Sequence, residues 1–166
     1  MELLTTKRLR LRNFKPEEKN TLLSFYLDKD IGKYMYWGDI KEGDIAFMIE
    51  RSLNRSFLDQ GAYIYAVSYL KSDRLVGEIY LEKKSNFFIL GYALKKSCQG
   101  HGYAYEILSA LLKKLDTDFP LLNVRAVVDK NNIKSKNLLY RLGFHDDMYQ
   151  PDSSSFITFS LYGPLC

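Results

Sequence analysis

The chain has 166 residues, enough for one domain with a hydrophobic core and few for two. Its composition is that of a globular protein, with 46% hydrophobic and 27% charged residues. The net charge of +4 suits a polyanionic ligand, but it is too small, and the basic residues are too scattered, to predict a nucleic-acid-binding protein.

The cysteine count and the apolar runs set the expected compartment. Cys98 and Cys166 predict free thiols in a reducing environment rather than a disulfide framework. No apolar run has the length of a membrane span, and the first residues do not form a signal peptide. We therefore expect a cytoplasmic protein with no membrane partner and no bound metal.

The N-terminal third alternates between strand and helix patterns. Residues 3–11 predict a half-buried strand, with Arg8, Arg10 and Arg12 on the solvent-exposed face. Pro16 followed by two glutamates predicts a helix that extends to about Leu27. The aromatic segment 34–38 is expected to be a loop, and apolar residues at helical spacing predict a second helix over 42–58.

Three strands are expected next, over residues 62–70, 75–81 and 87–94, and the short turns between them predict an antiparallel meander.

The C-terminal part continues with a helix, a strand and a second helix, followed by two strands. Gly143 marks the end of the second helix, as a glycine just past a helix commonly does. The expected ranges are 102–115 for the first helix, 122–128 for the strand, 133–142 for the second helix, and 145–149 and 156–161 for the last strands. The sequence therefore predicts an α/β (α+β) fold over residues 1–166, with a mixed, mostly antiparallel sheet of about seven strands and about four helices.

The segment 96–106 joins an apolar strand to the start of a helix. Gly100 and Gly102 allow positive φ angles and a close approach of the backbone to a ligand. The helix start presents unpaired N–H groups and the positive end of the helix dipole. This arrangement favours a bound phosphate or diphosphate. Spacing alone also allows a simple tight turn between strand and helix.

This loop resembles that of a known family. Gln99-x-x-Gly102-x-Ala104 is similar to the diphosphate-binding loop of the GCN5-related N-acetyltransferases, which bind acetyl-coenzyme A. The run from Gly100 to Glu106 resembles the RimJ/RimL-type branch, which acetylates the N-termini of ribosomal proteins and various small amines. Because a third glycine and a Lys-Ser/Thr pair are missing, the loop does not fit an NAD-binding or P-loop site.

Further blocks of sequence extend the resemblance over nearly the whole chain. Residues 4–12, 76–79 and 90–94 are similar to the family's first, third and fourth strands, and 129–144 to its Asn-x-x-Ser helix and the Gly-Phe that ends it. In that fold the fourth and fifth strands, here 87–94 and 122–128, splay apart, and the pantetheine arm of the cofactor lies between them.

The resemblance implies a set of cofactor-binding residues. The backbone of Ala93 and Leu94 is expected to pair with pantetheine, and Asn132 to bond its amides or the thioester end. His101 is expected to be solvent-exposed rather than catalytic. The residues expected to hold the diphosphate are Gln99, Gly100, His101, Gly102, Tyr103 and Ala104.

The group that would protonate the departing thiolate differs from the family pattern. Many members have a tyrosine five residues before the phenylalanine of the Gly-Phe pair, and this chain has Leu139 there. Tyr140 is one position along, which turns a helical side chain by about 100°, so we do not assign it this role. Ser135 is the candidate to hydrogen-bond the sulfur, and its alternative is a helix-packing serine.

The expected base also departs from the pattern, because Ile89 stands where many close relatives have a glutamate. Glu78, on the neighbouring strand, is the candidate to accept the amine proton. The alternatives are a solvated carboxylate at this position and loss of the proton through water. Glu106, in the first turn of its helix, is expected to interact favourably with the helix dipole.

The family resemblance implies direct transfer of an acetyl group from acetyl-CoA, as co-substrate, to a primary amine. The amine is a protein N-terminus or a small molecule, and Tyr36 and Trp37 are the candidate residues that contact it. We expect a monomer or homodimer. The alternative hypothesis is a non-catalytic acyl-CoA-binding or regulatory domain on the same fold.

Overall fold

The computed structural model describes residues 1–32, 34, 41–56, 59–147 and 155–162. Its centre is an open sheet with the strand order β1-β2-β3-β4-β5-β6-β8-β7, in which β5 and β6 form the parallel pair and the other pairs are antiparallel. The predicted mixed architecture is confirmed, with eight strands and five α-helices in the described part of the chain. The candidate residues Tyr36 and Trp37 lie outside the described residues.

The strands are β1 (Glu2–Thr5), β2 (Leu9–Arg12), β3 (Gly61–Tyr69), β4 (Leu75–Lys83), β5 (Phe87–Leu94), β6 (Asn123–Asp129), β7 (His145–Asp146) and β8 (Phe156–Leu161). The helices are α1 (Lys19–Tyr26), α2 (Lys29–Gly32), α3 (Glu42–Ser52), α4 (Tyr103–Asp118) and α5 (Ile133–Arg141), with the 3-10 turns η1 (Pro16–Glu18) and η2 (Lys96–Cys98). None of these helices is both long and apolar enough to cross a membrane.

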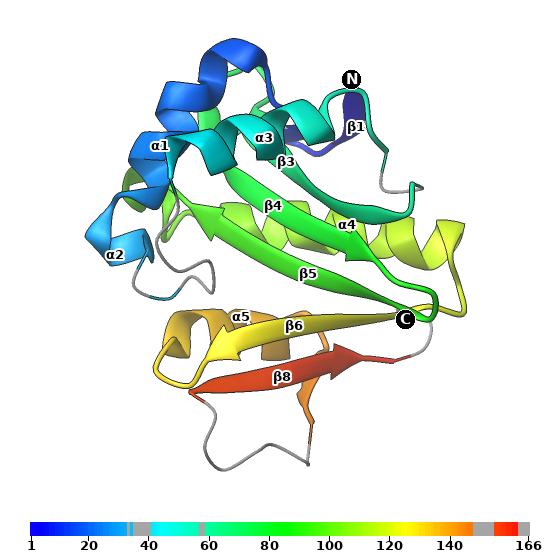
Figure 1. The fold of residues 1–166 in the computed structure, drawn as a ribbon. Coiled ribbons are helices and arrows are strands. Elements are labelled where there is room, and N and C mark those ends of the chain that lie inside the picture. Colours follow the sequence, from blue (N-terminus) through cyan, green and yellow to red (C-terminus); the bar gives the residue numbers. More distant parts are fainter. Residues whose placement is uncertain (33, 35–40, 57–58, 148–154, 163–166) are drawn as a thin grey trace.

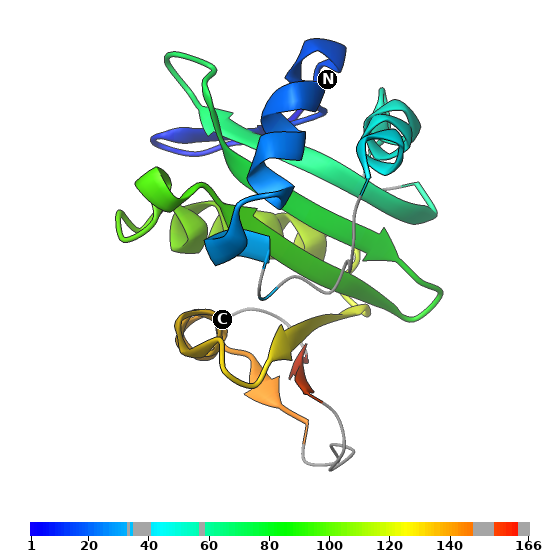
Figure 2. The same ribbon diagram turned by 60° about the vertical axis from the view of Figure 1, so that its left-hand side comes forward.

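Helices cover both faces of the sheet, so the molecule has two cores (Figures 1 and 2). Alternate residues of a strand point to opposite faces. On β4, Ile79 belongs to the core that α4 and α5 cover, whereas its neighbour Glu78 faces the side of α1 and α3. The first core is the larger, and its fully buried side chains include Tyr65, Phe88, Leu108, Leu111, Leu139, Phe144 and Phe159.

The first 12 residues form a hairpin rather than the single strand expected over 3–11. β1 and β2 pair antiparallel, and the chain turns between Thr6 and Leu9. The Thr6 backbone N–H donates to the Leu9 carbonyl at 2.8 Å, and its hydroxyl oxygen accepts from the Leu9 N–H at 3.1 Å. A local side-chain bond of this kind competes with an extended strand.

Arg12 was expected on the solvent-exposed face, but only 6% of it is exposed. Its guanidinium donates to both carboxylate oxygens of Glu18 at 2.8 Å, and its Nε donates to Asp73 at 2.9 Å. Burial alone would raise the pKa of Glu18. The hydrogen bonds that it accepts, above all the one from Arg12, outweigh burial and hold this pKa below its usual value. The network joins the start of α1 to the β3–β4 turn.

Several helix and strand boundaries differ from those expected from the sequence. The helix expected over 42–58 ends at Ser52, because the Ser52 carbonyl accepts a bond from the Asn13 amide at 2.7 Å and Asn54 adopts a left-handed φ of 58°. β7 is a two-residue strand, and the last part of the range expected for it, 145–149, lies outside the described residues.

The predicted splay between the central strands is confirmed. β5 and β6 pair from Phe87–Asn123 to Leu90–Ala126 and then cease to pair, although both strands continue. In Figure 1 they run close together at one end and separate toward their arrowheads. Both α4 and α5 follow from these separated ends.

Candidate functional site

The loop that follows β5 presents an open row of backbone N–H groups. Gly100 and Gly102 have φ angles of 80° and 77°, which glycine adopts most easily. The first backbone bond of α4 runs from the Glu106 N–H to the Gly102 carbonyl. The three N–H groups before it have no acceptor within the helix. No atom lies within 4 Å of the position that a Gly100 side chain would occupy. The loop can therefore admit an anion such as a diphosphate.

Glu106 ties this loop to the N-terminal hairpin. One oxygen of its carboxylate accepts from the Thr6 hydroxyl at 2.6 Å and from the Arg8 N–H at 2.9 Å. The other accepts from Arg8 Nε at 2.6 Å. Partial burial raises the pKa of Glu106, but the bonds from Thr6 and Arg8 outweigh burial and hold its pKa below the usual value. Glu106 thus stays ionised and bridges segments 98–100 residues apart.

Aromatic contacts fix the other side of the loop. The Arg8 guanidinium lies 4.4 Å from the centre of the Tyr103 ring, and the Tyr69 ring meets Tyr103 edge to face at 5.5 Å. The His101 ring stacks on Tyr103 at 5.6 Å. The side chains of His101 and Tyr103 therefore support the loop from the hairpin side.

Gln99 makes a bond that the sequence does not reveal. Its side-chain amide donates to the Leu94 carbonyl at 3.1 Å, so it closes the loop onto the last residue of β5. The Leu94 carbonyl, expected to pair with pantetheine, therefore already has one partner. Ala93 lies beside it, opposite Glu78 in the β4–β5 ladder.

A second group of polar side chains lies across the splay. The Asn132 side chain caps α5 by accepting from the Ser135 N–H at 3.1 Å. The Ser135 hydroxyl lies 2.9 Å from the Tyr92 hydroxyl of β5. Burial raises the pKa of Tyr92, and the bond with Ser135 partly opposes this. Tyr92 and Ser135 therefore join the two separating halves of the sheet.

Sequence reasoning missed Tyr92, although its position on β5 carried a signal. Residues two apart on a strand share a face, so Tyr92 faces α5 together with Leu90 and Leu94. A polar aromatic residue among core leucines needs a partner for its hydroxyl. Tyr140, by contrast, is 46% exposed and packs edge to face on Phe159, whereas its neighbour Leu139 is fully buried.

Glu78 is fully enclosed on the opposite face of the sheet. Its exposed fraction is 1%, so the alternative reading as a solvated carboxylate is wrong. The Tyr26 hydroxyl of α1 donates to Glu78 Oε2 at 2.6 Å. Burial raises the pKa of Glu78 to about 7, while the bond from Tyr26 opposes that rise. A carboxyl with this pKa can take and release a proton near neutral pH.

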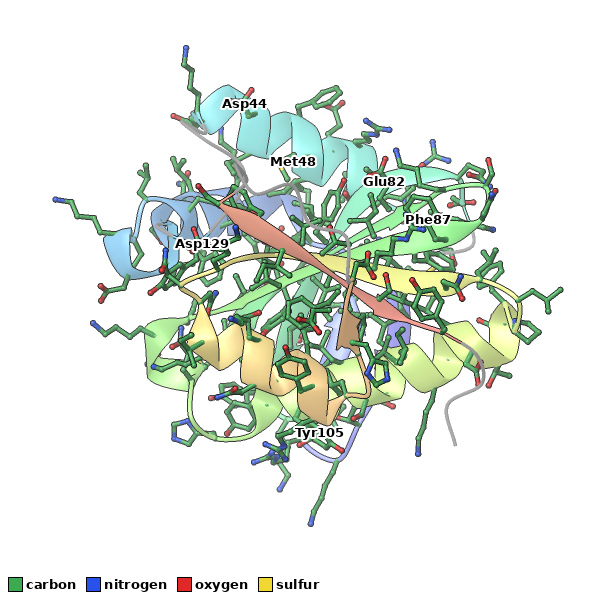
Figure 3. The ribbon with its side chains drawn as sticks, turned by 90° about the horizontal axis from the view of Figure 1, so that it is seen from below. Asp44, Met48, Glu82, Phe87, Tyr105 and Asp129 are labelled. Carbon is green, nitrogen blue, oxygen red and sulfur yellow. The ribbon has the colours of Figure 1, made fainter. Side chains whose placement is uncertain are left out.

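The two polar groups thus flank β5 from opposite sides. Tyr92 faces α5, and Glu78 faces α1. Because β5 and β6 are unpaired at this end, the splay opens beside Ala93, which lies opposite Glu78 in the β4–β5 ladder. Glu82 and Phe87, labelled in Figure 3, lie at the other end of the sheet, where β5 and β6 are still paired.

A hollow of about 520 Å³ opens between α1–α2 and the segment that enters the glycine loop. Phe25 and Ile31 form its apolar part, and Asp28 lies among its polar residues. The Asp28 carboxylate accepts bonds from the N–H groups that begin α2, at 2.8 and 3.3 Å. The hollow therefore adjoins both the loop and the helix that carries Tyr26.

Comparison with known proteins agrees with this arrangement. Residues 8–145 match the family described as the acetyltransferase (GNAT) domain. The chain is 25% identical to the uncharacterized N-acetyltransferase p20 of Bacillus licheniformis over 150 residues, which are 89% of this chain and 84% of that protein.

Solved structures have the same fold. The structure of a ribosomal-protein-serine acetyltransferase homologue from Vibrio cholerae superimposes with a TM-score of 0.77 at 24% identity, covering 97% of each chain. RimL, the ribosomal L7/L12 alpha-N-protein acetyltransferase, was solved in complex with coenzyme A. It superimposes with a TM-score of 0.78 at 13% identity, again over 97% of each chain.

The Glu106 bridge leads to a prediction about the loop. In Glu106→Gln the neutral amide loses the charge-assisted bonds from Arg8, so we expect amide hydrogens of residues 100–106 to exchange about tenfold faster. Hydrogen–deuterium exchange followed by mass spectrometry measures this. Asp118→Asn is the matched control, because it removes a carboxylate paired with Lys114 at the far end of α4. Equal exchange in wild type and Glu106→Gln would contradict the role given to the bridge.

Proposed function

Because the chain belongs to the acetyltransferase (GNAT) domain family, we propose that it is an acetyl-CoA-dependent N-acetyltransferase acting on a primary amine. The observation that carries the proposal is the splay between β5 and β6. It brings the glycine loop and the Tyr92–Ser135 pair to one end of the sheet. The resemblance to RimL, which was solved with coenzyme A, supports the choice of cofactor.

The proposed cofactor site uses mainly backbone groups. The loop from Gln99 to Ala104 would hold the diphosphate through the N–H groups that begin α4. Ala93 and Leu94 would offer the open edge of β5 to the pantetheine arm, and Asn132 would reach it from α5. The cofactor supplies an acetyl group activated as a thioester.

The chain's own residues would assist each stage of the transfer. Ser135 would donate a hydrogen bond to the departing sulfur, with Tyr92 behind it as the group that holds its hydroxyl. Glu78 would accept the proton that the amine loses, since its pKa of about 7 leaves it partly ionised at neutral pH. Backbone N–H donors of the splayed strands would stabilise the developing negative charge on the acetyl oxygen. No covalent enzyme intermediate is needed.

The hollow beside α2 is the proposed approach of the acceptor. It adjoins the Glu78 side of the sheet, and its apolar wall suits an acceptor that carries a short apolar part, while its charged lining combines Asp28 with Lys95 and Lys96. RimL acts on a ribosomal-protein N-terminus, so we propose a protein N-terminus or a small amine as the acceptor class. The residues Tyr36 and Trp37 stay predicted contacts.

The test of this function is release of coenzyme A from acetyl-CoA in the presence of a panel of amines. The panel should contain N-terminal peptides, polyamines and aminoglycosides. We expect turnover with at least one of them. Tight binding of coenzyme A without turnover across the panel would favour a non-catalytic acyl-CoA-binding domain instead.

Ser135→Ala separates transfer from binding. We expect kcat to fall about tenfold or more, since a hydrogen bond to a charged group is worth about 1.5–3 kcal/mol, while the Kd for coenzyme A changes little. Tyr140→Phe is the control on the same helix, because its ring is exposed and packs on Phe159. Equal kcat in Ser135→Ala and wild type would remove the assigned role.

The glycine loop allows a second, matched comparison. Gly102→Ala and Gly143→Ala both place a methyl group at a positive φ, 77° and 89°, and neither Cβ would approach another atom closer than 3.5 Å. Both variants should therefore lose similar stability. Only Gly102→Ala should weaken coenzyme A binding, about tenfold, because it disturbs the N–H groups beside the diphosphate. Isothermal titration calorimetry measures both affinities, and equal values would argue against the loop.

A further inference from the structure

A buried tyrosine and a buried glutamate meet between α1 and β4, far from each other in the sequence. Tyr26 is the last residue of α1, and its hydroxyl donates to Glu78 Oε2 at 2.6 Å. Their exposed fractions are 8% and 1%. A short hydrogen bond to a carboxylate is strong where little solvent reaches it, so this bond holds both side chains firmly.

The neighbouring strands leave room for this contact. Glu78 lies opposite Ala66 on β3 and Ala93 on β5, so all three share one row on the same face of the sheet. Because alanine ends at Cβ, the Tyr26 ring can lie over this row and reach the carboxylate. Leu22 and Phe25, buried on the same side of α1, fix the helix against the sheet. Among the described residues, Tyr26 is the hydrogen-bond partner of Glu78.

The other polar groups on this face are engaged elsewhere. Arg12, in the same row on β2, pairs with two carboxylates. Tyr80, the next residue of β4 on this face, donates to Glu82 at 3.0 Å. The buried residues of α3 are Ile45, Ile49 and Ser52, and the Ser52 hydroxyl oxygen accepts from the Ile64 N–H at 3.0 Å. Tyr26 is therefore the titratable group that acts directly on Glu78 in the described part of the chain.

We propose that Tyr26 is a positioning residue for acetyl transfer, whose hydroxyl fixes the direction in which the Glu78 carboxylate faces the acceptor amine. The inference rests on the proposed function, in which Glu78 accepts the amine proton. One oxygen of the carboxylate receives the Tyr26 bond, so the orientation of the other is set by α1. Because Phe25, the preceding residue of α1, lines the hollow, the same helix would place both the amine and its base.

The hydrogen bond also sets the ionisation of Glu78. Burial raises its pKa to about 7, and the Tyr26 hydroxyl favours the ionised form. Tyr26→Phe keeps the ring and removes the donor, so the carboxyl should become harder to ionise. We expect its midpoint to move upward by about one pH unit. Since the ionised form accepts the proton, the rise of kcat/KM with pH should move to higher pH by the same amount.

The test uses two readouts on the full chain. The first is ¹³C NMR of labelled glutamate carboxyl groups between pH 5 and pH 10 without substrate, in which the Glu78 signal is the one absent from Glu78→Gln. The second is the pH profile of kcat/KM with the best amine of the panel. At pH 7, Tyr26→Phe should retain about one fifth of the wild-type kcat/KM and should recover at high pH.

Tyr80→Phe is the matched control, since it also removes a tyrosine-to-glutamate bond on the same face of β4. It should leave both the NMR midpoint and the pH profile in place. If Tyr26→Phe does not fold, 3-fluorotyrosine introduced at position 26 keeps the bond and strengthens the donor. Both midpoints should then move to lower pH, and no movement would overturn the proposal.

The outcomes distinguish this inference from the function beneath it. Unchanged midpoints in Tyr26→Phe would overturn the positioning role while leaving the transferase proposal intact. A Glu78→Gln enzyme with the wild-type pH profile would show that Glu78 is not the base, which overturns this inference and that step of the proposed function. Absence of turnover with every amine would overturn both.

Discussion

The site depends on the point at which β5 and β6 stop pairing. Four residue pairs, Phe87–Asn123 to Leu90–Ala126, hold the two halves of the sheet together in parallel, and then the strands separate. Backbone groups that leave a ladder need other partners, and a pantetheine arm with its amides can supply them. Because β5 and β6 are parallel, the helices that follow them, α4 and α5, start at this same end. The glycine loop, the Asn132 cap and Ser135 therefore gather there.

The sheet also separates two kinds of chemistry. The Tyr92–Ser135 pair lies on the face covered by α4 and α5, and the Tyr26–Glu78 pair lies on the face covered by α1 and α3. Burial raises the pKa of a titratable group in each pair, to about 7 for Glu78 and above its ordinary value for Tyr92. Here β5 stands between them. A substrate lying in the splay could therefore lose a proton on one face and accept one on the other.

The sequence predicted the order of elements, the splay and the positive-φ glycines, because these follow from local patterns and from a family resemblance that spans most of the chain. It could not predict where polar side chains find their partners. Arg12 was predicted to be solvent-exposed from the alternation of the strand, yet it is buried between two carboxylates, Glu18 six residues away and Asp73 61 residues away. From sequence alone, Glu78 could equally be a solvated carboxylate, whereas in the structure α1 covers it and buries it. The partner of the Tyr92 hydroxyl can be predicted only when the register of β5 and the position of α5 are both known.

The loop itself is less local than its motif suggests. Glu106 lies in the first turn of α4, and a bare carboxylate one turn from an anion site would repel a diphosphate. Arg8 resolves this conflict, because it pairs with Glu106 at 2.6 Å and also lies against Tyr103. The negative charge is therefore offset before an anionic ligand arrives. The N-terminal hairpin thus contributes to the electrostatics of a loop that begins nearly 90 residues later in the sequence.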